Sequence, residues 1–118
     1  TVKEYVNALH ELVVDPETAV QQILVMPIAP HKQTSKGRVE AQAARRETSR
    51  AWNQELRSLL PVDGSVFLLD YETALQVPDQ ESYILKPAFN ADSTHMNAAF
   101  APHLEEAIAN CGCDLDLF

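Results

Sequence analysis

The sequence predicts an α/β fold in which two parallel β-strands are flanked by helices. Three observations point to this fold class. Predicted helices and strands alternate along the chain, both strand-like runs are apolar on both faces, and a long helix connects them. Strand, helix and second strand then form a right-handed βαβ unit. The 118 residues fit one domain, either a single α/β domain or the C-terminal part of a larger one.

Residues 2–13 predict the first helix, because their apolar side chains recur at the spacing of one helix face. These side chains are Val2, Tyr5, Val6, Leu9, Leu12 and Val13. An Asp-Pro-Glu sequence at 15–17 predicts the turn that ends the helix. Residues 22–28 predict a strand whose apolar side chains do not alternate with polar ones, so both its faces are expected to be buried. Pro27 marks the end of this strand.

Residues 38–60 follow a polar, basic loop and predict a long helix, since they are rich in Ala, Glu, Arg and Gln. The apolar stripe of this helix comprises Trp52, Leu56, Leu59 and Leu60. We interpret Trp52 as a core residue rather than a platform for a ligand. A turn at 61–64 leads to residues 65–70, which predict the second buried strand.

The C-terminal third contains less regular structure. Residues 71–76 predict a short helix, and residues 77–94 are expected to be irregular. Pro102 suits the first turn of a last helix. Gly112 is a candidate for the cap of that helix, because glycine adopts the left-handed conformation that commonly ends helices.

Two parallel strands alone make a poor sheet, because their outer edges lack hydrogen-bond partners. Both predicted strands are also too apolar for edge positions. We therefore expect additional polypeptide to complete the sheet, either a segment preceding Thr1 or a separate chain.

The net charge of −8 argues against binding to nucleic acids or to anionic membrane surfaces. No apolar run approaches the roughly 18 residues of a membrane span. Seven of the nine Lys and Arg residues lie within residues 32–57, whereas 14 of the 17 acidic residues lie outside this window. We interpret this window as a solvated helix with internal ion pairs, and the alternative is a basic face for an acidic partner.

Cys111 and Cys113 are interpreted as reduced thiols, because a disulfide that spans a single residue is strained and unusual. Together with His95 and His103 they fit no standard zinc spacing, so we expect no metal site. His31 and Lys32 follow the first strand, at the sheet end where ligands bind in α/β proteins. We expect them in a solvent-exposed loop, with a role in a substrate pocket as the alternative.

The sequence Asp92-Ser93-Thr94-His95 is the feature with the clearest chemical meaning, and it precedes the last helix. At this spacing in a turn, the Asp92 carboxylate can bind Nδ1 of His95 and fix the tautomer of the imidazole. Nε2 can then accept a proton from a serine hydroxyl, as in a catalytic triad. The alternative is a hydrogen-bonded loop pair without chemistry.

Around this motif, three segments are similar to consecutive elements of one enzyme family: QILVMPIAP, AWNQELRSLL and SVFLLDY. The chain thus resembles the C-terminal part of an SGNH (GDSL-type) serine ester hydrolase. The resemblance implies a flavodoxin-like, three-layer α/β/α fold, with Asp92 as triad acid and His95 as general base. It further implies a small-molecule or carbohydrate ester as substrate, no cofactor, and a structural role for Asp70, through binding of backbone N–H groups.

The family's Gly-Asp-Ser nucleophile motif, its oxyanion glycine and its Gly-x-Asn-Asp block do not occur in this sequence. Asn97 follows the histidine as in the family, but Ala98 stands near the position of the usual glycine. This chain alone should not hydrolyse esters, because it supplies neither nucleophile nor oxyanion hole. Two functions remain open: an ester hydrolase completed by further polypeptide, or a non-catalytic SGNH-like subunit of a larger assembly. A small α/β module of flavodoxin-like or thioredoxin-like type fits poorly, since phosphate-binding glycines and a Cys-x-x-Cys motif are missing.

Overall fold

The computed structural model describes residues 1–31, 39–77, 83–89 and 96–117. Its longer elements are α1 (Val2–Val14), β1 (Ile23–Val25), α2 (Val39–Leu59), β2 (Val66–Leu68) and α3 (Ala101–Asn110). Short 3₁₀-helices are η1 (Glu72–Leu75), η2 (Pro87–Phe89), η3 (Ala98–Phe100) and η4 (Leu115–Leu117). The α/β class and the predicted order of helices and strands are confirmed.

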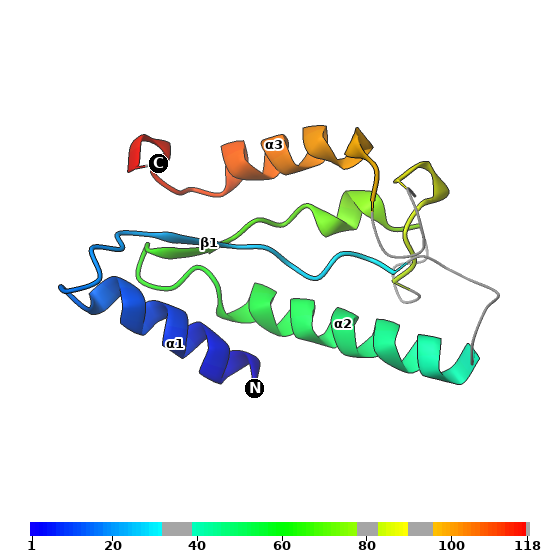
Figure 1. The fold of residues 1–118 in the computed structure, drawn as a ribbon, viewed down its shortest axis with the longest axis horizontal. Coiled ribbons are helices and arrows are strands. Elements are labelled where there is room, and N and C mark those ends of the chain that lie inside the picture. Colours follow the sequence, from blue (N-terminus) through cyan, green and yellow to red (C-terminus); the bar gives the residue numbers. More distant parts are fainter. Residues whose placement is uncertain (32–38, 78–82, 90–95, 118) are drawn as a thin grey trace.

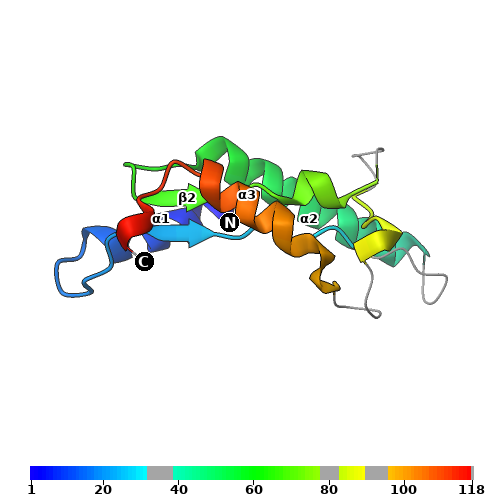
Figure 2. The same cartoon turned by 90° about the horizontal axis from the view of Figure 1, so that it is seen from above.

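The two strands are parallel neighbours, as the βαβ pattern predicts. Leu24 of β1 lies opposite Phe67 of β2, and α2 is the connection between the strands. Helices α1 and α2 lie on one side of the strand pair and α3 on the other (Figure 1). Seen from above, α3 runs obliquely from the carboxyl ends of the strands over the chain that follows them (Figure 2). Among the described residues, the strand pair is thus the middle layer between helices.

Apolar clusters on both faces of the strand pair explain why the strand sequences do not alternate. Between the strands and α1 and α2, the buried residues are Val2, Val6, Val25, Leu56 and Val66. On the α3 side, they are Leu69, Tyr71, Leu75, Leu85 and Phe89. Trp52 packs against the first of these clusters, which agrees with its interpretation as a core residue. Burial of both strand faces, predicted from the sequence, is confirmed.

Both strands are shorter than predicted, with three residues each. Pro27 cannot donate a backbone hydrogen bond, so it cannot continue a ladder at the end of β1. Beyond Pro27, the peptide groups of Ile28 bind the side chain of Asn53 instead of a neighbouring strand. Beyond the end of β1, a side chain of α2 therefore takes the hydrogen bonds that a neighbouring strand would make.

A short β-like segment follows the second strand and was not expected. Ile84 forms a parallel bridge with His31, and Leu85 forms an antiparallel bridge with Gln76. The N–H of His31 donates to the carbonyl of Tyr83 at 3.1 Å. This segment thus links the chain that leaves β1 to the chain that leaves β2. Apart from η2 and these isolated bridges, the described part of residues 77–94 is irregular, as predicted, and bridges to distant segments leave no local sequence pattern.

Cys111 and Cys113 form a disulfide, so the prediction of reduced thiols is wrong. The turn at Gly112, with φ of +80°, brings the two Cα atoms to 5.4 Å, within the range that disulfides span. Gly112 follows Cys111, the capping residue of α3. The cap is therefore Cys111 and not Gly112, the predicted cap, and Gly112 adopts the left-handed conformation one residue later, in the turn that makes the disulfide possible.

Candidate functional site

The candidate site lies beyond the carboxyl ends of β1 and β2, where polar side chains gather. Asn53 of α2 is its centre, with 1% of its surface exposed. The Oδ1 atom of Asn53 accepts from the N–H of Ile28 at 2.8 Å, and its Nδ2 donates to the Ile28 carbonyl at 2.7 Å. The Asn53 carboxamide thus pairs with a peptide group as a neighbouring strand would.

Tyr83 completes the environment of the Ile28 carbonyl. Its hydroxyl donates to that carbonyl and accepts a hydrogen bond from Asn53 Nδ2. Burial raises the pKa of the Tyr83 phenol far above its ordinary value, so the group remains a neutral donor. Tyr83 also has a φ of +52°, which is unfavourable for a non-glycine residue. Its hydrogen bonds and its burial, with 2% exposed, offset that strain.

His31 is held at the same end of the sheet. Its Nε2 lies 2.7 Å from the hydroxyl of Ser49 on α2, and its ring lies against that of Tyr83. Burial, and secondarily the charges of Arg45 and Arg46, lowers the pKa of His31 below 6.5. His31 is therefore neutral at neutral pH. His31 is partly buried rather than freely exposed as expected, because Ser49 and Tyr83 contact its ring, and Lys32 lies outside the described residues.

Arg57 connects α2 to the segment that follows β2. Its guanidinium lies 3.2 Å and 3.3 Å from the two carboxylate oxygens of Asp70, and it also pairs with Glu72. Asp70 was expected to bind backbone N–H groups, and its partner is instead this guanidinium. Glu72 is fully buried, so its charge depends on Arg57 for compensation. Neither partner of Arg57 was identified from sequence, because the contacts span more than ten residues.

A polar cavity of about 210 Å³ adjoins this cluster. It is lined by Arg50, Asn53, Gln54, Arg57, Glu72, Thr73, Gln76 and Tyr83. Gln76 has 6% of its surface exposed, and its Oε1 atom has no hydrogen-bond partner among the described residues. The same holds for Oε2 of Glu72. Buried acceptors without partners are uncommon in folded proteins, so they indicate a site that a further molecule completes.

The predicted dyad, Asp92 and His95, lies outside the described residues, but the chain on either side of it is described. The N–H of Asn97 donates to the carbonyl of Phe89 at 2.8 Å, and its Nδ2 donates to the carbonyl of Ala88 at 2.8 Å. These two hydrogen bonds hold the residues before and after the segment together.

Helix α3 begins directly after this pair of anchors. The Oδ1 atom of Asn97 accepts from the N–H of Ala99 and caps η3, which leads into α3. The ring of His103 on α3 packs edge-on against that of Phe89, with 5.6 Å between the ring centres. Asn97 follows His95 by two positions in the sequence, and its structural role is to join two chain segments.

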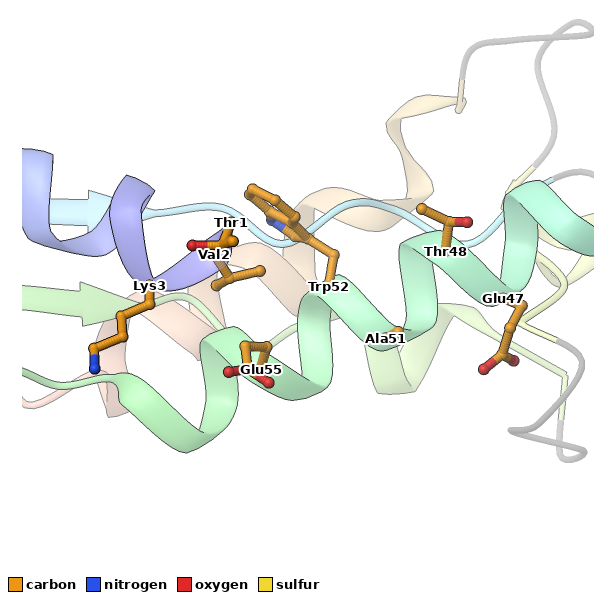
Figure 3. Close-up of a pocket in the computed structure, with 8 residues that line it drawn as sticks. All are labelled: Thr1, Val2, Lys3, Glu47, Thr48, Ala51, Trp52 and Glu55. Atoms are coloured by element: carbon orange, nitrogen blue, oxygen red, sulfur yellow. The ribbon is translucent and has the colours of Figure 1, made fainter.

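The structure contains two further cavities, the second of which shares Asp70 and Thr73 with this region. The first, of about 530 Å³, lies between the start of α1 and the middle of α2. Figure 3 shows the Trp52 ring beside Thr1 and Val2, with the carboxylates of Glu47 and Glu55 along α2. The second, of about 400 Å³, lies between the end of β2 and α3. Neither contains a described side chain with an unsatisfied buried polar atom, so neither indicates a ligand as the polar cavity does.

Within the described part of the chain, no three His, Cys, Asp or Glu side chains gather closely enough to hold a metal ion. The disulfide also removes both thiols from any ligand set. None of the described helices combines the length and apolar character that crossing a membrane requires.

Comparison of the chain with protein-family models, with curated proteins and with solved structures finds no match in any of the three. A functional proposal for this chain therefore depends on its own residues.

Proposed function

We propose that this chain supplies the acid and base of a serine ester hydrolase of SGNH type. Asp92 would orient His95 through Nδ1, and Nε2 of His95 would take the proton of a serine that attacks the ester carbonyl. His95 would then protonate the leaving alcohol. The serine and the oxyanion hole would come from polypeptide beyond this sequence, and the substrate would be a small-molecule or carbohydrate ester.

The observation that supports this proposal is the position of the anchors Phe89 and Asn97. They follow two parallel strands and immediately precede the helix that covers one face of the strand pair. In open α/β sheets, ligands bind beyond the carboxyl ends of the strands. An Asp-x-x-His segment between such anchors is suited to present an imidazole to a substrate there.

The outer edge of β1 supports the expectation of further polypeptide. The N–H of Ile23 donates to Ser65 at 2.8 Å, so the peptide groups of Ile23 point toward β2. Those of Leu24 point the opposite way, because the direction alternates along a strand. No backbone group within the described ranges pairs with them. Past β1, Met26 is 52% exposed and Ile28 is 39% exposed. An added strand would satisfy these peptide groups and cover these side chains.

A fluorophosphonate probe, which labels activated serines, tests the catalytic proposal on the protein with all the polypeptide that accompanies this chain. We expect labelling of the native protein and loss of labelling in His95→Ala. His10→Gln, a histidine change on α1, is the matched control and should label as the native protein does. Equal labelling of His95→Ala and the native protein would exclude His95 as the general base, and no labelling of either would exclude the hydrolase.

The second candidate function is a non-catalytic SGNH-like subunit that docks through its sheet edge. It is favoured by the missing nucleophile together with the unpaired edge of β1. Light scattering after size-exclusion chromatography distinguishes the cases for this chain by itself. A stable monomer of 13.1 kDa that unfolds cooperatively would argue against a required partner.

A further inference from the structure

We propose that the polar cavity between α2 and η1 is a binding site for a small, neutral, polyhydroxylated molecule such as a monosaccharide. The proposal concerns described residues alone and does not depend on hydrolase activity. It follows from the unsatisfied acceptors of the cavity, the balance of its charges and its size.

Two residues that line the cavity carry buried hydrogen-bond acceptors without a partner in the described part of the chain. Glu72 and Gln76 both line the cavity, and Oε2 of Glu72 and Oε1 of Gln76 have no hydrogen-bond partner among the described residues. Glu72 is 0% exposed and Gln76 is 6% exposed, so bulk water does not solvate these atoms freely. A buried acceptor without a donor lowers stability, and native proteins satisfy nearly all such groups. A molecule that occupies the cavity must therefore offer hydrogen-bond donors.

The charges argue against an anionic ligand. Arg50 and Arg57 both line the cavity, but both guanidiniums are already paired. Arg50 binds the carboxylate of Glu47 with its Nε at 2.9 Å. Arg57 is shared between Asp70 and Glu72. Each guanidinium is thus already compensated by a carboxylate, and no uncompensated positive charge remains to attract an anion.

A cationic ligand is disfavoured for a different reason. Glu72 is the acidic residue among those that line the cavity, and its carboxylate already pairs with Arg57, so its charge is compensated before a cation arrives. A neutral molecule needs no opposite charge from the cavity.

A hydroxyl group can serve the acceptors and the donors of the cavity at the same time. It can donate its proton to Glu72 or Gln76, and its oxygen can accept a hydrogen bond from a guanidinium N–H or from the hydroxyl of Thr73. Neighbouring hydroxyls on one ring would repeat this pairing with the next donor and acceptor. The volume, about 210 Å³, corresponds to about seven water molecules, which leaves room for one small ring.

Titration followed by ¹⁵N–¹H NMR tests this proposal on the 118-residue chain. The probes are glucose, galactose and myo-inositol, and cyclohexanol is the control ligand because it has a similar ring but one hydroxyl. We expect at least one polyol to produce saturable shifts at the backbone amides of Arg57, Thr73 and Gln76, in the millimolar range. Cyclohexanol should produce none there. Failure of all three polyols would overturn the proposal and leave water as the occupant.

Two variants separate the site from adventitious surface binding. Gln76→Met removes one orphan acceptor, and we expect it to weaken binding about threefold to tenfold, as the loss of one hydrogen bond would. Gln21→Met makes the same change at an exposed position outside the cavity and should not alter binding. If Gln76→Met fails to fold, Thr73→Val provides an independent test at an exposed lining residue. Undiminished binding in a folded Gln76→Met or Thr73→Val would overturn the assignment.

Discussion

Replacement of Asn53 by leucine tests whether a helix side chain takes the place of a strand beyond β1. Leucine has a similar size but can neither accept from the N–H of Ile28 nor donate to its carbonyl. The native distances of 2.8 Å and 2.7 Å indicate two well-formed hydrogen bonds, and Asn53 is 1% exposed. The perturbation therefore removes the polar pairing of a fully buried carboxamide with a part-buried peptide group.

The expected loss in the free energy of unfolding depends on which hydrogen bonds the N–H and the carbonyl of Ile28 retain in the variant. Its carbonyl still accepts from the hydroxyl of Tyr83, so this side loses one net hydrogen bond, about 1 kcal/mol. Its N–H has no other described partner and lies in a part-buried position, so the loss of its hydrogen bond costs about 1–3 kcal/mol, and less where water can replace Asn53. The free energy of unfolding should therefore fall by about 2–4 kcal/mol, a large part of the roughly 5–15 kcal/mol typical of a domain.

Urea denaturation followed by circular dichroism measures this change. With an m value of about 1.5 kcal/mol/M, the midpoint should decrease by about 1–3 M. Gln54→Leu is the matched control, because it makes the same change at the next position, where the side chain is exposed. It should remain within about 0.5 kcal/mol of the native protein. If the Asn53 and Gln54 variants had equal midpoints, the carboxamide would not be replacing a strand.

Two further predictions concern charges of the same cluster. Arg57→Met leaves the buried carboxylate of Glu72 without compensation and should lower the free energy of unfolding by about 3–5 kcal/mol. Arg57→Lys keeps the positive charge and should lower it less. Equal urea midpoints for the two variants would refute the role of the charge. The folded-state pKa of His31 lies below the ordinary 6.5, so the unfolded chain binds more protons between these two values, and stability should decrease as pH falls through 6.5. Comparing His31→Gln with the native protein across this range should show a smaller decrease in the variant, and an unchanged pH dependence would contradict the assignment.

The elements that the sequence predicted correctly are those encoded by short-range patterns. The 3.6-residue repeat of α1, the Ala-rich stretch of α2 and the two apolar runs each report on local structure. Parallel pairing then follows from the helix between two buried strands. Gly112 could be placed after the last helix because its conformational freedom is itself a local property.

The features that the sequence did not reveal depend on contacts between distant residues. The bridges of Ile84 and Leu85 join segments that follow different strands. Asn53 is separated from Ile28 by 25 positions, and nothing in the helix sequence marks one amide as buried. The ion pair of Arg57 with Glu72 has the same origin. Opposite charges are frequent on helices, and the sequence does not indicate which of them the fold removes from water.

The polyol site and the Asp92–His95 dyad depend on different parts of the chain and can be tested separately. The polyol site is formed by α2 and η1, which the Arg57 ion pairs and the Asn53 carboxamide hold beyond the ends of the strands. The dyad, in contrast, lies in residues 90–95, outside the described part of the chain, between the anchors Phe89 and Asn97. Asn97→Ala should therefore loosen the anchors without changing the polar cavity. If His95 is the general base, this variant should reduce fluorophosphonate labelling while the polyol-induced shifts at Gln76 persist. Loss of both together would mean that the two regions form one cooperative site, and retention of both would show that the anchors do not position His95.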